Sequence, residues 1–343
     1  MISAEGIDKV TVIGTTSWGT TLAVLLARRE ISTYLWSWQE EEAARLQRDG
    51  ENKLLQPGLR FPPALTVTHN LGDALAGAGL VVLVVPSSSL RENLRRLRPH
   101  LDPASIVLSA VKGLESETGK RMSEVIGEEL GPALSTAVCV LSGPNLSREI
   151  ARGLPAAAIV ACGDLPTAEA VRGLLMGPSF RVYTGSDVVG VEMAGALKNI
   201  IAIGAGMCDG FGYGDNGKAA FLTRGLAEIT RLGVAAGAQA LTFIGLAGVG
   251  DLVSTCYSSL SRNHTVGFEM AKGRPLNEIL ASLGQVAEGV TTTVAARNLA
   301  RRLGVEMPIT EKMYEVLFEG LDPHRGVAEL MAREPKRELH GVQ

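Results

Sequence analysis

Residues 12–23 read VIGTTSWGTTLA: a short apolar run, a turn containing glycine, and the start of a helical stretch. This order is close to the G-x-G-x-x-G turn that cradles pyrophosphate in dinucleotide-binding domains. There the first glycine permits a tight turn, the second lets the backbone approach the phosphates, and the third lets the helix pack on the sheet. Gly14 and Gly19 match the first and third positions, but Thr16 replaces the second. The stretch predicts a strand, a turn and a helix starting near Trp18, with the Thr16 side chain either holding a phosphate back or donating its hydroxyl to it.

A second decisive position follows the next predicted strand, Ser32–Trp36, where the chain continues as SWQEEE. In dinucleotide-binding domains a carboxylate about 20 residues beyond the glycine turn holds the ribose of NAD, whereas a base holds the 2′-phosphate of NADP. Neither type directly follows this strand: Ser37 is neutral, and Trp38 could stack on adenine or pack locally. This position alone does not choose between the two cofactors.

Composition excludes several classes of protein. The 343 residues suffice for two domains, and 46% of them are hydrophobic against 20% charged. A net charge of −3 without a basic stripe, and only 4% aromatic residues, argue against a nucleic-acid partner. The longest apolar runs are strand-sized, such as LVVLVVP, and the start has no signal-peptide pattern, so we expect no membrane span and a cytoplasmic location. The cysteines are widely spaced and form no C-x-x-C motif, so we expect reduced thiols and no metal site; they are Cys139, Cys162, Cys208 and Cys256.

The first part of the chain alternates β-branched runs with helical patterns. Buried strands that alternate with helices predict an α/β domain over residues 1–186, a Rossmann-type, doubly wound parallel sheet covered on both faces. The predicted strands are Val10–Gly14, Ser32–Trp36, Leu80–Val85, Ser105–Ser109 and Ala137–Leu141, followed by AAAIVAC and FRVYT. The predicted helices between them are Thr20–Arg29, Glu40–Asp49, Ser88–Leu97 and Gly119–Glu129.

After Ser186 the strand patterns stop and long helix-compatible segments follow. They predict an all-α second domain over residues 187–343. The predicted helices are Val188–Cys208, Lys218–Ala236, Ser261–Lys272, Thr291–Leu303 and Pro308–Phe318.

The first helix of this domain contains an unexpected lysine. Across residues 188–207 only Glu192, Lys198 and Asn199 carry a charge or an amide. The helical face of Lys198 is formed mainly by small residues, which are Val191, Gly195, Ala202 and Ala205. A desolvated lysine has a lowered pKa and can exchange a proton near neutral pH, so we interpret Lys198 as a proton donor or acceptor. The alternative is a lysine that reaches out of the helix to solvent.

A phosphate site is predicted in the later segment GLAGVGDLVSTCYSSLSRNHTVGFEM. Ser261 is a suitable N-cap, which places Arg262 and Asn263 in a first helical turn whose free amides and dipole favour an anion. Arginine also binds phosphate through two parallel hydrogen bonds. With Lys198 and Asp251, this segment predicts a pocket for a small phosphorylated substrate.

Lys112 is a further candidate, in the segment SAVKGLE of the first domain. It stands just beyond the carboxyl end of a predicted strand, which is where open α/β sheets bind their ligands.

Motifs along nearly the whole chain resemble those of bacterial NAD(P)-dependent glycerol-3-phosphate dehydrogenase. In that family's order they are GxxSWGTxLA, VPS, VKGLE, SGPN, ARGLPAAAIVA, ALKNIIAIGAGMCDG, GVGDLVSTC and SRNHTVG, and NKLLQPGLRFP resembles a loop of the same family. The resemblance implies a second domain like the C-terminal domain of 6-phosphogluconate dehydrogenase. It also implies that the protein reduces dihydroxyacetone phosphate to sn-glycerol 3-phosphate by hydride transfer from NADH or NADPH. The product would supply glycerophospholipid synthesis.

The resemblance also implies roles for individual residues. Lys198 is implied as the proton donor, with Asp251 orienting it and Lys112 adding positive charge, and no metal is required. The implied substrate-binding residues are Lys112, Gly143, Asn145, Lys198, Asp251, Ser261, Arg262 and Asn263. The implied cofactor-binding residues are Ser17, Trp18, Lys112, Ser147, Arg262, Val286 and Glu288. The glycine turn and the end of the second strand add Gly14, Thr16, Gly19 and Trp38 as predicted cofactor-binding residues.

Three positions depart from the family pattern. Thr16 replaces the usual middle glycine, and Asn145 stands where serine or threonine is usual. Trp38 and Gln39 stand where the family usually has histidine or arginine, so we expect NADH to be accepted at least as well as NADPH.

Two other functions stay open from the sequence. One is a related dehydrogenase that acts on another small phosphorylated or hydroxy-acid substrate, and the other is a non-catalytic dinucleotide-binding protein. Lys198, Asp251 and Arg262 together argue against the second, because a binding module has no use for an ammonium in an apolar helix. A homodimer stays open as the oligomeric state.

Overall fold

The computed structural model describes residues 6–131, 138–284, 286–335 and 338. The chain divides into two compact units, the first formed by Met1–Val111 and Met122–Val188, and the second by Lys112–Arg121 and Val189–Gln343. The expected division assigned the segment Lys112–Arg121 to the first domain, whereas in the structure this segment belongs to the second unit. It packs on the second unit, where Arg302 Nη1 donates to the Thr118 carbonyl at 3.0 Å.

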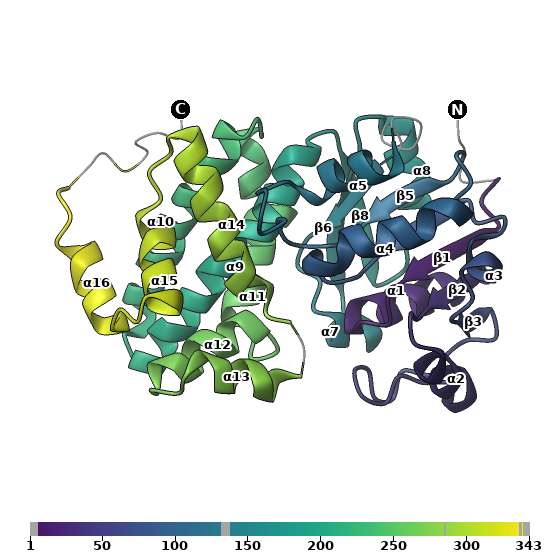
Figure 1. The fold of residues 1–343 in the computed structure, drawn as a ribbon, viewed down its shortest axis with the longest axis horizontal. Coiled ribbons are helices and arrows are strands. Elements are labelled where there is room, and N and C mark those ends of the chain that lie inside the picture. Colours follow the sequence, from purple (N-terminus) through teal and green to yellow (C-terminus); the bar gives the residue numbers. More distant parts are fainter. Residues whose placement is uncertain (1–5, 132–137, 285, 336–337, 339–343) are drawn as a thin grey trace. The chain divides into compact units, whose positions relative to one another are not determined.

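The first unit is built on an eight-stranded sheet with the order β3-β2-β1-β4-β5-β6-β7-β8 (Figure 1). The order reverses between β1 and β4, which are parallel neighbours. This is the position where doubly wound sheets open a crevice at the carboxyl ends of their strands. The strands are β1 Lys9–Ile13, β2 Ser32–Trp36, β3 Leu65–Thr68, β4 Leu80–Leu83, β5 Ile106–Ser109, β6 Val138–Ser142, β7 Ala156–Ala161 and β8 Phe180–Gly185.

Helices cover both faces of this sheet because successive strand residues point to opposite sides. Leu80 and Val82 of β4 belong to one hydrophobic core, whereas Val81 and Leu83 belong to the other. The first core includes side chains of α1 Ser17–Ala27, α2 Glu40–Asp49, α7 Ser147–Ala151 and α8 Leu165–Leu175. The second includes side chains of α3 Leu71–Leu75, α4 Leu90–Leu97 and α5 Met122–Leu130, and the short helices η2 Ser87–Ser89 and η3 Arg98–His100 flank α4. The predicted doubly wound α/β domain is confirmed.

Two features of the sheet differ from the prediction. The strand β3 was missed, since its four residues, LTVT, alternate with polar threonines and are too few to give a clear apolar run. The strands β6 and β7 are antiparallel, whereas the other neighbours are parallel. The five-residue α7 between them is too short to carry the chain back across the sheet for a parallel pairing. Ala137, the first residue of one predicted strand, lies outside the described residues.

The second unit is helical, as predicted. Its longest elements are α9 Val188–Phe211 and α10 Gly214–Ala235. The others are η4 Ala240–Ile244, η5 Leu246–Gly250, α11 Asp251–Tyr257, α12 Arg262–Ala271, α13 Leu276–Leu283, α14 Glu288–Leu303, α15 Pro308–Phe318 and α16 Pro323–Met331. Of these, α11, α13 and α16 were not predicted, because helices of seven to nine residues give only about two turns of periodicity.

The helix α9 corrects the expectation that every apolar run is strand-sized. It has 24 residues and, by length and composition alone, could cross a membrane. However, 89% of its most apolar window is buried within the protein. The burial indicates that α9 is the central helix of the second unit, around which other helices pack.

Glycines let α12 cross α9 at backbone distance. A Cβ at Gly206 would lie 2.0 Å from the His264 carbonyl oxygen, and a Cβ at Gly267 would lie 1.7 Å from that of Ile203. No side chain fits at either position, so the backbones of α9 and α12 are in direct contact. This crossing sets where the first turn of α12 lies along α9.

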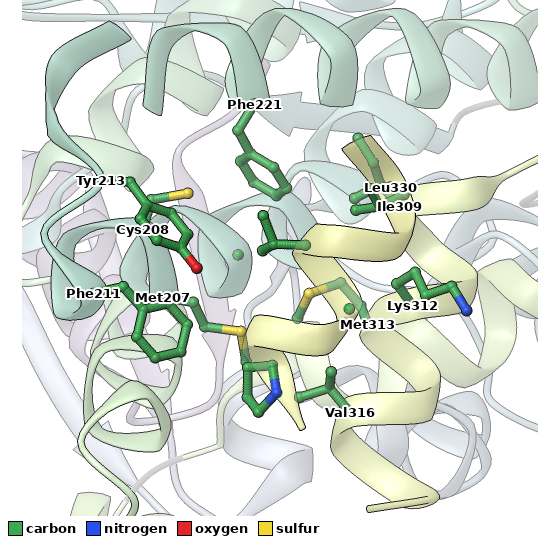
Figure 2. A pocket seen from close by; sticks show the side chains of 14 residues that line it. Met207, Cys208, Phe211, Tyr213, Phe221, Ile309, Lys312, Met313, Val316 and Leu330 are labelled. Atoms are coloured by element: carbon green, nitrogen blue, oxygen red, sulfur yellow. The ribbon is translucent and has the colours of Figure 1, made fainter. Parts of the chain in front are cut away.

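A hydrophobic pocket lies between α9, α10, α15 and α16 (Figure 2). Phe221 packs into it because the facing residue is Gly204, where a Cβ would lie 2.2 Å from the ring. Its other labelled side chains are apolar apart from Tyr213 and Lys312, and the Lys312 ammonium pairs with Glu315 and Glu329. This pocket lacks the unpaired cations that a phosphorylated substrate requires, so we place no substrate there.

Candidate functional site

The turn after β1 needs its two glycines. Gly14 has a φ of +111°, and a Cβ there would lie 2.8 Å from the Val84 carbonyl oxygen at the end of β4. A Cβ at Gly19 would lie 2.1 Å from the carbonyl oxygen of Gly14. The first glycine therefore permits the turn and the third permits close packing of α1, as the motif predicts. The helix begins at Ser17, one residue before the expected Trp18.

Thr16 uses its hydroxyl inside the protein. It is the N-cap of α1, where its Oγ1 accepts a hydrogen bond from the Gly19 amide at 3.0 Å. The same oxygen donates to the Val84 carbonyl at 3.0 Å, across the reversal point of the sheet. With a φ of −59°, the position does not require glycine. The single hydroxyl hydrogen is thus already bonded, which argues against donation of this hydroxyl to a phosphate.

Two buried amides that we did not predict hold this turn in place. Asn52 Nδ2 donates to the Thr15 carbonyl at 3.1 Å, and Gln56 Nε2 donates to Ser17 Oγ at 2.8 Å. Ser17 Oγ also lies 2.7 Å from Ser147 Oγ, so the structure brings two predicted cofactor residues together. Asn52 and Gln56 belong to NKLLQPGLRFP, whose resemblance to a family loop was the available signal.

Of the five buried side-chain polar atoms that have no hydrogen-bond partner among the described residues, four lie near the carboxyl ends of the sheet, and the fifth, Thr292 Oγ1, lies in α14. The four are Oγ of Ser109 and Ser142, which end β5 and β6, together with Trp18 Nε1 and Asn145 Oδ1. Buried polar groups in native proteins are nearly always bonded, so these atoms indicate a ligand in the first unit. Gly143 lies next to them with a φ of +134°, and a Cβ there would be 3.0 Å from the Ala157 carbonyl oxygen. These observations fit a bound dinucleotide.

The end of β2 presents an indole and a carboxylate. Trp38 is 64% exposed, which disfavours the local-packing alternative and leaves its face free to stack on a base. Glu42 of α2 reaches back to the strand ends, where Ser37 Oγ donates to its carboxylate at 2.6 Å. Glu42 was not predicted, because it lies within the helix after β2 and because its contact with Thr15, 27 residues earlier in the chain, depends on the tertiary structure.

Lys198 is buried in the second unit, with 7% of its side chain exposed. Its Nζ donates to Asp251 Oδ1 at 2.9 Å and to Thr255 Oγ1 at 2.5 Å. The alternative of a lysine extending to solvent is therefore wrong. An ammonium has three N–H donors, and these contacts use two of them.

Asp251 joins a second lysine to the same site. Lys112 Nζ donates to Asp251 Oδ2 at 2.7 Å, so one carboxylate bridges both ammonium groups. Burial, together with the nearby Lys198 charge, lowers the pKa of Lys112 to about 8, although Asp251 opposes the shift. Two cations around one anion leave a net positive charge in a site of low solvent exposure, which suits an anionic substrate.

The first turn of α12 is tied to the residue next to Lys198. Ser261 is the N-cap, as predicted, and its Oγ accepts from the His264 amide at 3.2 Å. Asn263 Nδ2 donates to Asn199 Oδ1 at 2.9 Å, while its Oδ1 accepts from the Gly289 amide at 2.9 Å. Asn263 therefore connects α9, α12 and α14. Neither Asn199 nor Thr255 was predicted, because their roles depend on partners in other helices.

Three predicted cofactor residues of the second unit lie at its surface or near it. Arg262 and Val286 are exposed, and Glu288 begins α14 with partial burial. Their roles toward the dinucleotide stay predictions.

The four cysteines are free and buried. Among the described residues, no group of three or more histidine, cysteine, aspartate or glutamate side chains is arranged to hold a metal ion.

The arrangement is that of the two-domain dinucleotide-dependent dehydrogenases, in which a Rossmann-type unit precedes a helical unit. Comparisons with known proteins narrow this class. The family described as NAD-dependent glycerol-3-phosphate dehydrogenase matches in both parts, its N-terminus over residues 9–168 and its C-terminus over residues 187–328.

Individual relatives agree with the family match. Glycerol-3-phosphate dehydrogenase [NAD(P)+] of Moorella thermoacetica is 49% identical over 332 residues, which cover 97% of this chain and 98% of the relative. The protein of the same name from Dehalococcoides mccartyi is 48% identical over 97% of this chain and 93% of its own length. The crystal structure of glycerol-3-phosphate dehydrogenase from Coxiella burnetii has a TM-score of 0.91 at 36% identity, covering 95% of this chain and 99% of that one. The chain therefore belongs to the family of NAD(P)-dependent glycerol-3-phosphate dehydrogenases, and the resemblance drawn from its motifs is confirmed.

Proposed function

We propose that this protein reduces dihydroxyacetone phosphate to sn-glycerol 3-phosphate with NADH or NADPH, and that it supplies glycerophospholipid synthesis in the cytoplasm. The observation that carries the proposal is the buried Asp251 carboxylate bridging Lys198 and Lys112. Relatives that cover nearly the whole chain carry the name of this activity.

Lys198 is the proposed proton donor. When bound, the nicotinamide supplies a hydride to C2 of the substrate ketone, and the oxygen at C2 then needs a proton. Lys198 has one N–H beyond those given to Asp251 and Thr255, and this hydrogen is free to protonate that oxygen. Asp251 and Thr255 hold the ammonium in one orientation, which keeps the donor positioned.

Lys112 and the first turn of α12 are proposed to bind the anionic parts of the substrate. Lys112 adds positive charge beside Lys198, which stabilises negative charge developing on the C2 oxygen. Arg262 and the amides after Ser261 receive the phosphate at a helix N-terminus. The bond between Asn263 and Asn199 sets the spacing from this turn to Lys198. Binding energy from the phosphate then orients the ketone.

The first unit is proposed to hold the dinucleotide. The Gly14 turn and the start of α1 receive the pyrophosphate, and Trp18, Ser147 and Asn145 supply polar groups near it. Gly143 allows the backbone after β6 to approach a ligand closely.

The test is a spectrophotometric assay of purified protein with dihydroxyacetone phosphate and each reduced cofactor. We expect oxidation of the cofactor and formation of sn-glycerol 3-phosphate. A panel of other phosphorylated ketones and 2-keto acids is the control. Faster turnover of a panel member would favour the related dehydrogenase, and dinucleotide binding without any turnover would favour the non-catalytic alternative.

We also propose a homodimer formed through the helical unit, which exposes large hydrophobic side chains such as Leu241, Ile244 and Met331. Sedimentation velocity tests this, and a monomer at micromolar concentration would contradict it.

A further inference from the structure

A carboxylate lies across the carboxyl ends of two neighbouring strands in the first unit. Glu42 Oε2 accepts hydrogen bonds from Thr15 Oγ1 at 2.7 Å and from Ser37 Oγ at 2.6 Å. Thr15 lies in the glycine turn after β1, and Ser37 directly follows β2. The Glu42 side chain is 24% exposed and is held by two short bonds. These hydrogen bonds to Thr15 and Ser37 therefore fix the position of the Glu42 carboxylate at the strand ends.

These contacts also remove the hydroxyl donors from that edge of the sheet. A serine or threonine hydroxyl has one hydrogen to donate. Thr15 and Ser37 both donate theirs to Glu42, and Ser37 Oγ accepts from the Gln39 amide at 3.2 Å. Neither hydroxyl can donate to a phosphate while Glu42 accepts from it.

The charges around Glu42 are predominantly negative. The first turn of α2 carries Glu40, Glu41 and Glu42. Arg45 is the nearest cation on this helix, with its Nη2 3.8 Å from Glu42 Oε1, and His69 Nε2 lies 3.9 Å from Glu40. Three carboxylates thus lie near the strand end at which NADP-dependent enzymes place arginine.

We propose that Glu42 makes this protein select NADH over NADPH. Its Oε1, which receives neither hydroxyl, can accept a hydrogen bond from a ribose 2′-hydroxyl, as the carboxylate of NAD-dependent Rossmann domains does. The 2′-phosphate of NADPH instead carries about −1.5 to −2 charges at neutral pH, and it would meet a fixed carboxylate and two hydroxyls that donate elsewhere. This inference rests on the proposed function, because it names which dinucleotide the proposed site selects.

The test measures binding without the substrate. Isothermal titration calorimetry of the full chain with NADH, NADPH, ADP-ribose and 2′-phospho-ADP-ribose reports selectivity at the adenosine end. For the unaltered protein we expect NADH to bind at least about tenfold more tightly than NADPH, a difference of one decade in Kd. We expect the same order for the two nicotinamide-free fragments.

Variants of two adjacent glutamates separate a specific contact from a general charge effect. Glu42→Gln keeps the side-chain shape but removes the charge, and we expect the NADPH:NADH ratio of Kd values to fall to about threefold or less. Glu42→Arg should reverse the preference, because arginine binds phosphate in a bidentate manner. Glu41→Gln is the matched control: it removes the same charge from an exposed position in the same turn and should leave the ratio unchanged.

The outcomes distinguish this inference from the proposed function. Equal binding of NADH and NADPH by the unaltered protein would overturn the inference even if dihydroxyacetone phosphate is reduced. An equal change of the NADPH:NADH ratio of Kd values in Glu41→Gln and Glu42→Gln would also overturn it, because such a change would come from the net charge of the turn and not from a specific contact of Glu42. Failure to bind either dinucleotide would overturn the proposed function and the inference with it.

Discussion

At the scale of single residues, the proposed chemistry depends on a carboxylate shared by the buried Lys198 and the partly buried Lys112. Asp251 gives one oxygen to Lys198 and the other to Lys112. Removing a lysine from this triad leaves Asp251 paired with the other, so a single substitution does not leave an isolated buried charge. The two lysines can therefore be tested separately.

We predict that Lys198→Ala lowers kcat by about 10²–10⁴-fold, the usual contribution of a positioned proton donor. NADH affinity should change little, because the dinucleotide is proposed to bind the first unit. Stopped-flow oxidation of NADH and its binding titration give the two quantities. Lys53→Ala, at a lysine with 59% of its side chain exposed, is the control and should leave both unchanged. Unaltered turnover in Lys198→Ala would exclude this residue as the donor.

Lys112 gives a pH dependence with a defined sign. Because burial lowers its pKa to about 8, the side chain is charged at pH 7 and loses its proton as the pH rises through 8. We predict that kcat/KM for dihydroxyacetone phosphate falls above pH 8, by about tenfold per unit for a single titrating group. Lys112→Arg, which stays charged, should move this loss to higher pH. An identical profile in both proteins would assign the titration to another group.

At the scale of the helix and strand, caps fix the ends that carry function. We predict that Thr16→Val lowers the free energy of unfolding by about 1–2 kcal/mol, because it removes the cap of α1 and the bond to the Val84 carbonyl. Thr16→Ser retains both bonds and is the matched control. Urea unfolding measures both variants. Equal stability of the valine and serine variants would show that the cap contributes nothing.

A buried carboxylate caps the start of α15 in the same way. Glu228 of α10 accepts hydrogen bonds from the amides of Ile309 and Thr310, both at 2.8 Å, and burial raises its pKa to about 7. Between pH 4.5 and 7 the folded state therefore keeps a proton that the unfolded state has lost. This contribution to stability is complete below pH 4.5 and is lost as the pH rises through 7.

We predict that the free energy of unfolding falls between pH 5 and pH 8 by up to about 3 kcal/mol on account of Glu228. Glu228→Gln cannot titrate, so its stability should lack this part of the slope. Urea unfolding across the pH range measures the difference. Parallel pH profiles for the two proteins would contradict the role of Glu228.

At the scale of the whole molecule, helix crossings determine which side chains meet in the second unit. We predict that Gly267→Ala lowers the free energy of unfolding by about 3 kcal/mol, because its Cβ would lie 1.7 Å from the Ile203 carbonyl oxygen. The variant should also raise KM for dihydroxyacetone phosphate, since α12 carries the proposed phosphate turn. Gly163→Ala is the control, because a Cβ there has no atom within 4 Å. A folded Gly267→Ala protein with unchanged stability and KM would contradict this view of the crossing.

The sequence by itself determined the local elements and the residue types of the site. Periodicity identified β2, α2 and α15 with their observed bounds, since these depend on contiguous side chains. The glycine turn, the Ser261 cap and a lysine within an apolar helix were likewise visible, because each is defined by neighbours a few positions away. The order of the family motifs along the chain also supported the resemblance to glycerol-3-phosphate dehydrogenases.

Only the tertiary structure decided which of these side chains meet. It brought Asp251 between Lys198 and Lys112, directed the Thr16 hydroxyl to Val84, and carried Glu42 back to the ends of β1 and β2. The physical reason is that these contacts join segments far apart in sequence, where packing and hydrogen-bond satisfaction set the distances and no local pattern records the partner. The antiparallel pairing of β6 and β7 has the same origin, since it depends on where the chain between them can return.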